Sequence, residues 1–197
     1  MIPEAIVDLQ RHPLQDTHYL QSCKAKLDRT GALLMEDFLT LSAVEFLQTE
    51  ARKVQPLAYF CSQNHNAYLL DSDPALPVEH IRNLEQVSDK GCVPHDQVPE
   101  SSPLRTLYEW PDFREFLEGV LGEPVFPYAD TLSSININYF ERGQQLGWHF
   151  DNASFAVTFA FSVFSFVFPL SFSPYFSPTI TKLCSPLRVF KKGFACS

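Results

Sequence analysis

Apolar positions in the first third of the chain predict two helices with a strand between them. The first helix spans residues 14–29 and ends near Gly31. Its apolar positions are Leu14, Tyr19, Leu20, Cys23 and Leu27. Ala32 to Met35 read as a short buried strand. The second helix starts after Thr40 or Ser42, either of which can cap its N-terminus, and ends before Pro56.

In residues 57–102 the apolar positions follow neither the helical nor the strand period for long. Aromatic residues give a strand-like character around residues 59–60 and 68–70, and residues 79–84 allow a short helix. Five prolines fall between Pro74 and Pro103, so we predict that most of this segment is loop. His65 is expected in this loop, either solvated or bordering a substrate opening.

Regular patterns return at residue 103. Two short helices are predicted over residues 102–110 and 111–123, the second beginning at Pro111 and ending at Gly122.

A period-two alternation then sets Ile135, Ile137 and Tyr139 against Asn136, Asn138 and Phe140. It predicts a strand, followed by a turn at residues 141–145, a second strand at 146–151 and the start of a third at 153–161. The predicted arrangement is an antiparallel meander.

His149 and Asp151 lie two residues apart at the end of the second predicted strand. Residues i and i+2 of a strand point to the same side, so an imidazole nitrogen and a carboxylate oxygen can reach one ion. Two histidines and one carboxylate on one face suit non-haem Fe(II). A His-x-Asp pattern arises by chance about 0.3 times in a chain with this many His and Asp residues, so its surroundings must carry the assignment. Trp148, pointing to the opposite face, is expected to pack.

Composition excludes a general nucleic-acid binder and favours an intracellular protein. The net charge is −8, whereas phosphate neutralisation needs clustered Lys and Arg. Five cysteines without a paired spacing predict reduced thiols, and the N-terminal residues show no secretory signal. We therefore expect a cytoplasmic location and no nucleic-acid partner.

The charge is divided unevenly along the chain. Residues 1–151 carry 11 Lys/Arg and 23 Asp/Glu, giving −12, whereas residues 152–197 carry four basic residues and no acid, giving +4. Residues 159–178 contain seven Phe, five Ser and three Pro. Three interpretations of this tail remain open: a membrane span, a low-complexity tail, or translated non-coding sequence. We favour the third because Phe, Ser, Pro and Leu have pyrimidine-rich codons; a membrane association is not expected.

The pattern Tyr139-x3-Gly143-x5-His149-x-Asp151 resembles the core of the Fe(II)/2-oxoglutarate-dependent dioxygenases. It is most similar to the prolyl-hydroxylase-like branch, in which a Tyr on one strand leads through a Gly turn to the metal pair. The N-terminal half, including "GALLMEDFL" and "NHNAYLLDSDPALP", is similar to a group related to amino-acid hydroxylases and halogenases. The resemblance covers residues 14–158 and is most specific at 133–157.

This resemblance implies an α+β fold: an incomplete double-stranded β-helix (jelly roll) with N-terminal flanking helices. It implies an oxidoreductase that uses Fe(II), with 2-oxoglutarate as co-substrate, and O2 on a small-molecule or peptide substrate. His149 and Asp151 would be metal ligands, and Tyr139 with Asn138, or Asn136, would face the 2-oxoglutarate cavity. Asp151 favours hydroxylation, because the halogenases have a small residue there.

The chain departs from the family pattern after about residue 158. The family has a third ligand, a distal His, and then an Arg or Lys that pairs with 2-oxoglutarate; no histidine follows Asp151, and Arg188 is the one arginine after it. We expect open sheet edges, weak iron binding and impaired activity. The alternative is a non-catalytic interaction module that retains the N-terminal part of the fold.

Three regions are therefore predicted. They are a helical N-terminal region with substrate-side loops at residues 1–102, the start of the dioxygenase core at 103–158, and an aberrant tail at 159–197.

Overall fold

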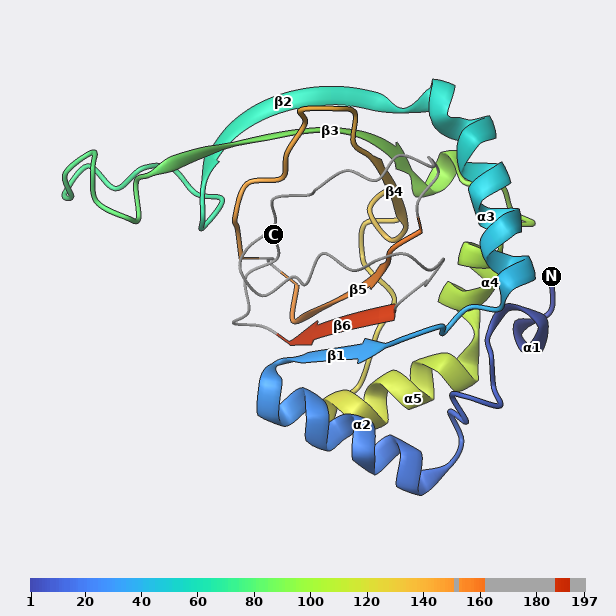
Figure 1. The fold of residues 1–197 in the computed structure, drawn as a ribbon. Helices are drawn as coiled ribbons and strands as arrows, with labels where there is room; N and C mark the ends of the chain where they lie inside the picture. Colours follow the sequence, from blue (N-terminus) through green and yellow to red (C-terminus); the bar gives the residue numbers. More distant parts are fainter. Residues whose placement is uncertain (151–152, 162–186, 192–197) are drawn as a thin grey trace.

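The computed structural model describes residues 1–150, 153–161 and 187–191 and shows a mixed α+β fold. Two three-stranded antiparallel sheets have the strand orders β1-β6-β5 and β2-β3-β4. In Figure 1 the sheet β2-β3-β4 lies above β1-β6-β5, with helices α2 and α5 below the lower sheet. In the described residues, no helix is both apolar and long enough to span a membrane.

The first two helices confirm their sequence signals. After a short α1 (Pro3–Ile6), α2 (Thr17–Thr30) begins where the Asp16 side chain accepts a hydrogen bond from the Tyr19 amide. It ends at Gly31, whose φ of 70° is the left-handed conformation that glycine adopts without steric cost. The helix α3 (Leu41–Val54) is capped by Thr40, one of the two predicted candidates, and a 3-10 turn (Gln55–Leu57) containing Pro56 follows it.

The lower sheet joins distant parts of the chain. The strand β1 (Ala32–Met35) was predicted, and β5 (Phe155–Phe159) falls within the third predicted strand. Between them lies β6 (Leu187–Lys191), which pairs antiparallel with both neighbours. Thus part of the region expected to be an aberrant tail, residues 159–197, forms the central strand of this sheet, and Phe159 ends β5; residues 162–186 and 192–197 lie outside the described residues.

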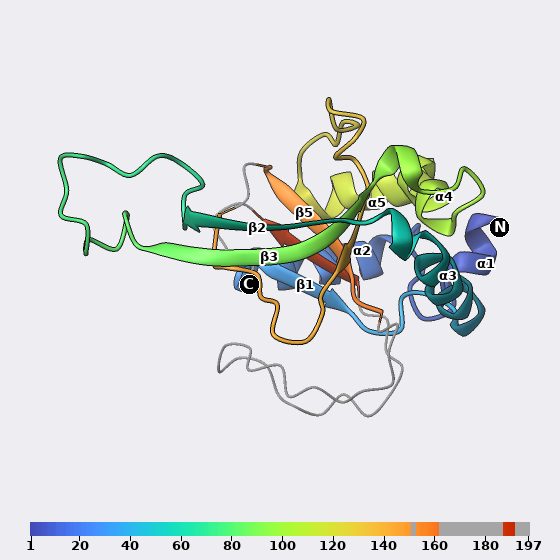
Figure 2. The same cartoon turned by 90° about the horizontal axis from the view of Figure 1, so that it is seen from above.

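The upper sheet shows a long hairpin within residues 57–102, which were predicted to be mostly loop. A long hairpin of β2 (Tyr59–Asn66) and β3 (Glu85–Pro94) occupies much of this segment, and β4 (Asn136–Tyr139) pairs with the second half of β3. Figure 2 shows the hairpin extending beyond the rest of the molecule. A 3-10 turn (His95–Gln97) leads from β3 towards the two predicted helices, α4 (Pro103–Glu109) and α5 (Pro111–Leu121), which are confirmed.

The tip of the hairpin is a loop organised by two buried asparagines. No helix forms at residues 79–84, contrary to the prediction. Instead the Asn83 amide nitrogen donates to the carbonyl oxygens of Asp73, Leu76 and Pro77. At the start of the loop, the Asn66 amide nitrogen donates to the Leu70 carbonyl at 2.7 Å. Side-chain amides therefore take the place of helical hydrogen bonds here.

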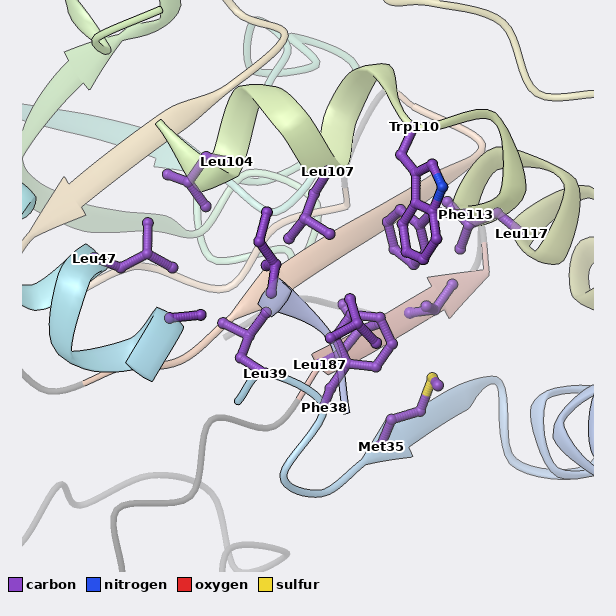
Figure 3. Close-up of a cluster of buried hydrophobic side chains, with 14 of the residues drawn as sticks. Met35, Phe38, Leu39, Leu47, Leu104, Leu107, Trp110, Phe113, Leu117 and Leu187 are labelled. Carbon is purple, nitrogen blue, oxygen red and sulfur yellow. The ribbon is translucent and has the colours of Figure 1, made fainter. Parts of the chain in front are cut away.

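The core lies between the lower sheet and the helices (Figure 3). Phe38 is fully buried, and its ring lies 5.6 Å from that of Phe113 and 6.1 Å from that of Phe159, between centroids. Leu187 and Val189 of β6 are also fully buried. Side chains from the N-terminal helices, α5 and both outer strands therefore share one apolar cluster with β6.

A buried carboxyl group on α3, that of Glu50, predicts a pH effect on stability. Glu50 accepts a hydrogen bond from the Ser102 hydroxyl, and burial raises the pKa of Glu50 despite that bond and the charge of Lys53. The folded state thus binds a proton more tightly than the unfolded state. The stabilisation from protonated Glu50 is fully present below the pKa that Glu50 has in the unfolded chain. It is lost as the pH rises through the higher pKa that Glu50 has in the folded chain. We expect the free energy of unfolding of Glu50→Gln to vary less over that acidic window, measured by urea denaturation at several pH values. An unchanged pH profile would contradict this assignment.

Candidate metal centre

The segment that carries His149 runs beside β3 and does not fold back as a hairpin strand. The predicted turn is present, with Gly143 at a φ of 91°. Beyond it the Gln145 carbonyl accepts from the Asp89 amide at 2.8 Å, and the Phe150 amide donates to the Ala67 carbonyl at 2.8 Å. Since β4 pairs with residues 91–94 of the same strand, the chain continues in one direction along β3. The predicted meander is therefore wrong at this point.

Side chains of β3 hold this segment in place of a regular backbone ladder. The Gly147 amide donates to the Ser88 hydroxyl oxygen at 2.9 Å, and the Trp148 amide donates to the Gln86 side-chain oxygen at 2.9 Å. Residues 145–150 form no regular strand, because these two amides donate to side-chain oxygens where a ladder would supply backbone carbonyls. The indole of Trp148, expected to pack, is 42% exposed.

The His149 ring is oriented by the backbone two residues before it. It is half-buried, and its Nδ1 lies 2.8 Å from the Gly147 carbonyl oxygen. A carbonyl oxygen can only accept, so Nδ1 carries the proton and the lone pair of the neutral ring is on Nε2. A metal-binding histidine commonly donates its other ring N–H to a carbonyl in this way. The backbone at Gly147 therefore sets the orientation of the His149 ring.

A second imidazole lies against the first. The His65 ring centroid is 5.6 Å from that of His149, and the rings meet edge to face at 83°. His65 belongs to β2 and is half-buried, which corrects its predicted place in a solvated loop. Its Nδ1 lies 3.0 Å from the Asn66 carbonyl and its Nε2 2.6 Å from the Ser88 hydroxyl. Its place beside His149 follows from the pairing of β2 with β3, which the sequence did not indicate.

The structure separates the two residues predicted to face 2-oxoglutarate. Tyr139 points into the core, where its hydroxyl donates to the Ala51 carbonyl at 2.7 Å. Burial, with smaller contributions from Glu50 and Cys92, raises the pKa of Tyr139 to about 12. Asn138 is exposed on the opposite face of β4, so the two side chains do not border the same space. Their binding roles stay predictions.

The remaining predicted ligands are partly outside the described residues. Asp151 lies outside them, as does most of the chain that follows. Arg188 is described through its backbone, which lies in register with Leu34 of β1 and Thr158 of β5. Within residues 1–150, 153–161 and 187–191, no three His, Cys, Asp or Glu side chains come together to form a metal site. His149 is therefore the one predicted ligand whose geometry is described.

A separate hollow of about 400 Å³ lies beside α2 and β1. Within it His12 is buried; its Nε2 donates to the Glu36 carbonyl at 2.8 Å and its Nδ1 accepts from the Tyr19 hydroxyl at 2.6 Å. Burial lowers the pKa of His12 and raises that of Tyr19, so both groups are neutral at pH 7. This arrangement ties the N-terminal segment to the strand and leaves both ring nitrogens of His12 engaged.

Comparisons with known proteins add no identification. No protein-family model matches the chain, and no curated protein is similar to it. The assignment of function therefore depends on the residues themselves and on the geometry around His149.

Proposed function

We propose that the chain derives from an Fe(II)- and 2-oxoglutarate-dependent dioxygenase of the hydroxylase type, with a jelly-roll core. His149 and Asp151 would hold the iron. The observation that carries the proposal is the hydrogen bond from His149 Nδ1 to the Gly147 carbonyl, the kind of contact that commonly orients a metal-binding histidine. Imidazole nitrogen with a carboxylate oxygen is a donor set that suits Fe(II).

Within this proposal the imidazole of His149 would be one iron ligand, and the distal histidine of the family pattern is not among the residues after Asp151. Bound Fe(II) would supply the activation of O2 for insertion into a C–H bond of a small molecule or peptide. The chain's own residues orient the imidazole and place it half-buried beside β3. Because no histidine follows Asp151, two side chains would coordinate the metal in place of three. We therefore propose that metal affinity and activity are low.

An anaerobic titration tests the proposal. We expect Fe(II) together with 2-oxoglutarate to give a weak visible charge-transfer band with the purified chain. His149→Ala is expected to remove the band, because one of the two ligands is lost. The matched control is His18→Ala, since His18 is exposed on α2. A band of equal strength in His149→Ala, or no iron bound by the wild-type chain at saturation, would contradict the proposal.

One observation favours a second candidate, a non-catalytic interaction module. The loop between β2 and β3 exposes apolar side chains, including Leu70 at 63%, Val78 at 79% and Ile81 at 75%. Exposed apolar clusters are common at binding surfaces. A wild-type chain that binds no iron, together with unchanged folding of a His149→Ala/Asp151→Ala variant, would favour this candidate.

A further inference from the structure

Four hydrogen bonds connect β2, β3 and the segment that carries His149. They run from His149 to the Gly147 carbonyl, from the Gly147 amide to the Ser88 hydroxyl, between that hydroxyl and His65, and from His65 to the Asn66 carbonyl. Their lengths are 2.8, 2.9, 2.6 and 3.0 Å between heavy atoms. Ser88 and Gly147, the central pair, are 59 positions apart in the chain.

The direction of each bond follows from which atoms can donate. The carbonyl oxygens of Asn66 and Gly147 can only accept, so both histidines donate through Nδ1. The Gly147 amide can only donate, so the Ser88 oxygen accepts from it. The Ser88 hydrogen is then available for Nε2 of neutral His65, which has a lone pair there. Each donor in the series thus has an acceptor, and the series specifies one tautomer for each ring.

Close packing around Gly147 also restricts which residue this position accepts. Gly147 is buried, and a Cβ added to it would lie 2.9 Å from Cβ of Gln86 and 3.1 Å from Cε1 of His65. It would also lie 3.1 Å from the Val87 carbonyl oxygen. No side chain fits without moving β3 or the His65 ring. The position therefore requires glycine, and the Ser88 hydroxyl accepts a hydrogen bond from its amide.

We propose that Ser88, oriented by His65, is a positioning residue for the metal-binding histidine. Its hydroxyl fixes the Gly147 peptide, and the Gly147 carbonyl in turn fixes the tautomer and direction of the His149 ring. This role rests on the proposed function as far as the metal is concerned. The orientation of the ring is a property of the metal-free chain, and it can be measured independently.

The first test needs no metal. Long-range proton–nitrogen NMR of the imidazoles reports which ring nitrogen carries the proton. We expect the wild-type chain to show His149 protonated at Nδ1 and Ser88→Ala to show a mixture of tautomers. Ser88→Thr, which keeps the hydroxyl on a residue that favours strands, is expected to restore the wild-type spectrum.

The second test measures binding of Co(II) alone, as a probe for Fe(II), through its visible absorption. Loss of an interaction that orients a metal ligand typically lowers affinity by about 10–100-fold, and we expect a loss in that range for Ser88→Ala. Ser88→Thr is expected to recover it. The matched control is Ser62→Ala, because Ser62 is an exposed serine of β2 in register with Asp89.

The outcomes separate the two proposals. A wild-type chain that binds neither Co(II) nor Fe(II) would end the proposed function, and the NMR comparison would still decide the role of Ser88. Unchanged tautomers in Ser88→Ala would overturn the positioning role, whatever the metal affinity. The NMR spectrum would also reveal whether Ser88→Ala is unfolded. In that case the comparison of Ser88→Thr with wild type decides: the positioning role requires that the two agree in tautomer and in Co(II) affinity.

Discussion

Leu187→Asp is expected to destabilise the chain by about 4 kcal/mol or more. Leu187 is fully buried in β6, which lies between β1 and β5. A carboxylate at this position would be removed from water without a cationic partner from the apolar cluster around it, and this cost is a large fraction of a typical total stability of about 5–15 kcal/mol. Urea denaturation followed by circular dichroism measures the change.

The matched control for this substitution lies on the neighbouring strand. Leu34 of β1 is 46% exposed, and Leu34→Asp is expected to change the free energy of unfolding by about 0.5 kcal/mol or less. Equal effects of the two substitutions would show that β6 does not contribute to the folded core. That result would restore the interpretation of the whole segment after residue 158 as a tail outside the fold.

Phe38→Ala is expected to cost about 3–5 kcal/mol. Phe38 is fully buried, and its ring contacts the rings of His12, Phe113 and Phe159, so truncation leaves a cavity between three elements. For a chain of this size, each kcal/mol lowers the melting temperature by roughly 2–4 °C, which gives a shift of roughly 6–20 °C. Thermal unfolding followed by circular dichroism checks this value.

Phe46→Ala is the control for the aromatic truncation. Phe46 is 42% exposed on α3, so a smaller part of its ring leaves water on folding than of the fully buried Phe38 ring. We expect a change of about 1 kcal/mol. If Phe38→Ala were no more destabilising than this control, the placement of Phe38 at the centre of the core would be wrong.

Helices of this chain were predictable because their signals are local. Asp16 and Thr40 cap the first turns, Gly31 and Gly122 adopt the left-handed conformation after the last turns, and apolar side chains recur at the helical period. Each of these signals acts within a few residues. The sequence alone was therefore enough to place α2, α3, α4 and α5.

The strand β3 was missed because its stability is not local. Its sequence, "EQVSDKGCVP", has no clean alternation, and glycine, aspartate and lysine are poor strand formers. Pairing with β2 on one side and β4 on the other supplies its hydrogen bonds. The strand β6 was obscured for a different reason: the composition before it suggested sequence that does not fold, while only Leu187 and Val189 indicate a buried face.

The candidate site divides in the same way. His149 was singled out from its short spacing to Asp151, which needs only local sequence. His65 was considered as a residue bordering a substrate opening, but its contact with His149 and the role of Ser88 were not foreseen, since both depend on the pairing of distant strands. Tyr139 was correctly placed on the inward side of its strand, and the partner of its hydroxyl, the Ala51 carbonyl, lies 88 positions away.

The strand β3 sets the distance along the sheet between Tyr139 in the core and the imidazole of His149. Residues 91–94 of β3 align Tyr139 and its neighbours, and residues 86–89 of the same strand align Gln145 to Trp148. The intervening residues 140–144 bulge away, and nothing lies within 4 Å of a Cβ added to Gly143. A residue inserted or removed at 140–144 would therefore leave the contacts of Tyr139 and His149 with β3 in place. A single residue gained or lost within β3 would shift His149 relative to Tyr139 and reverse which side chains face inward.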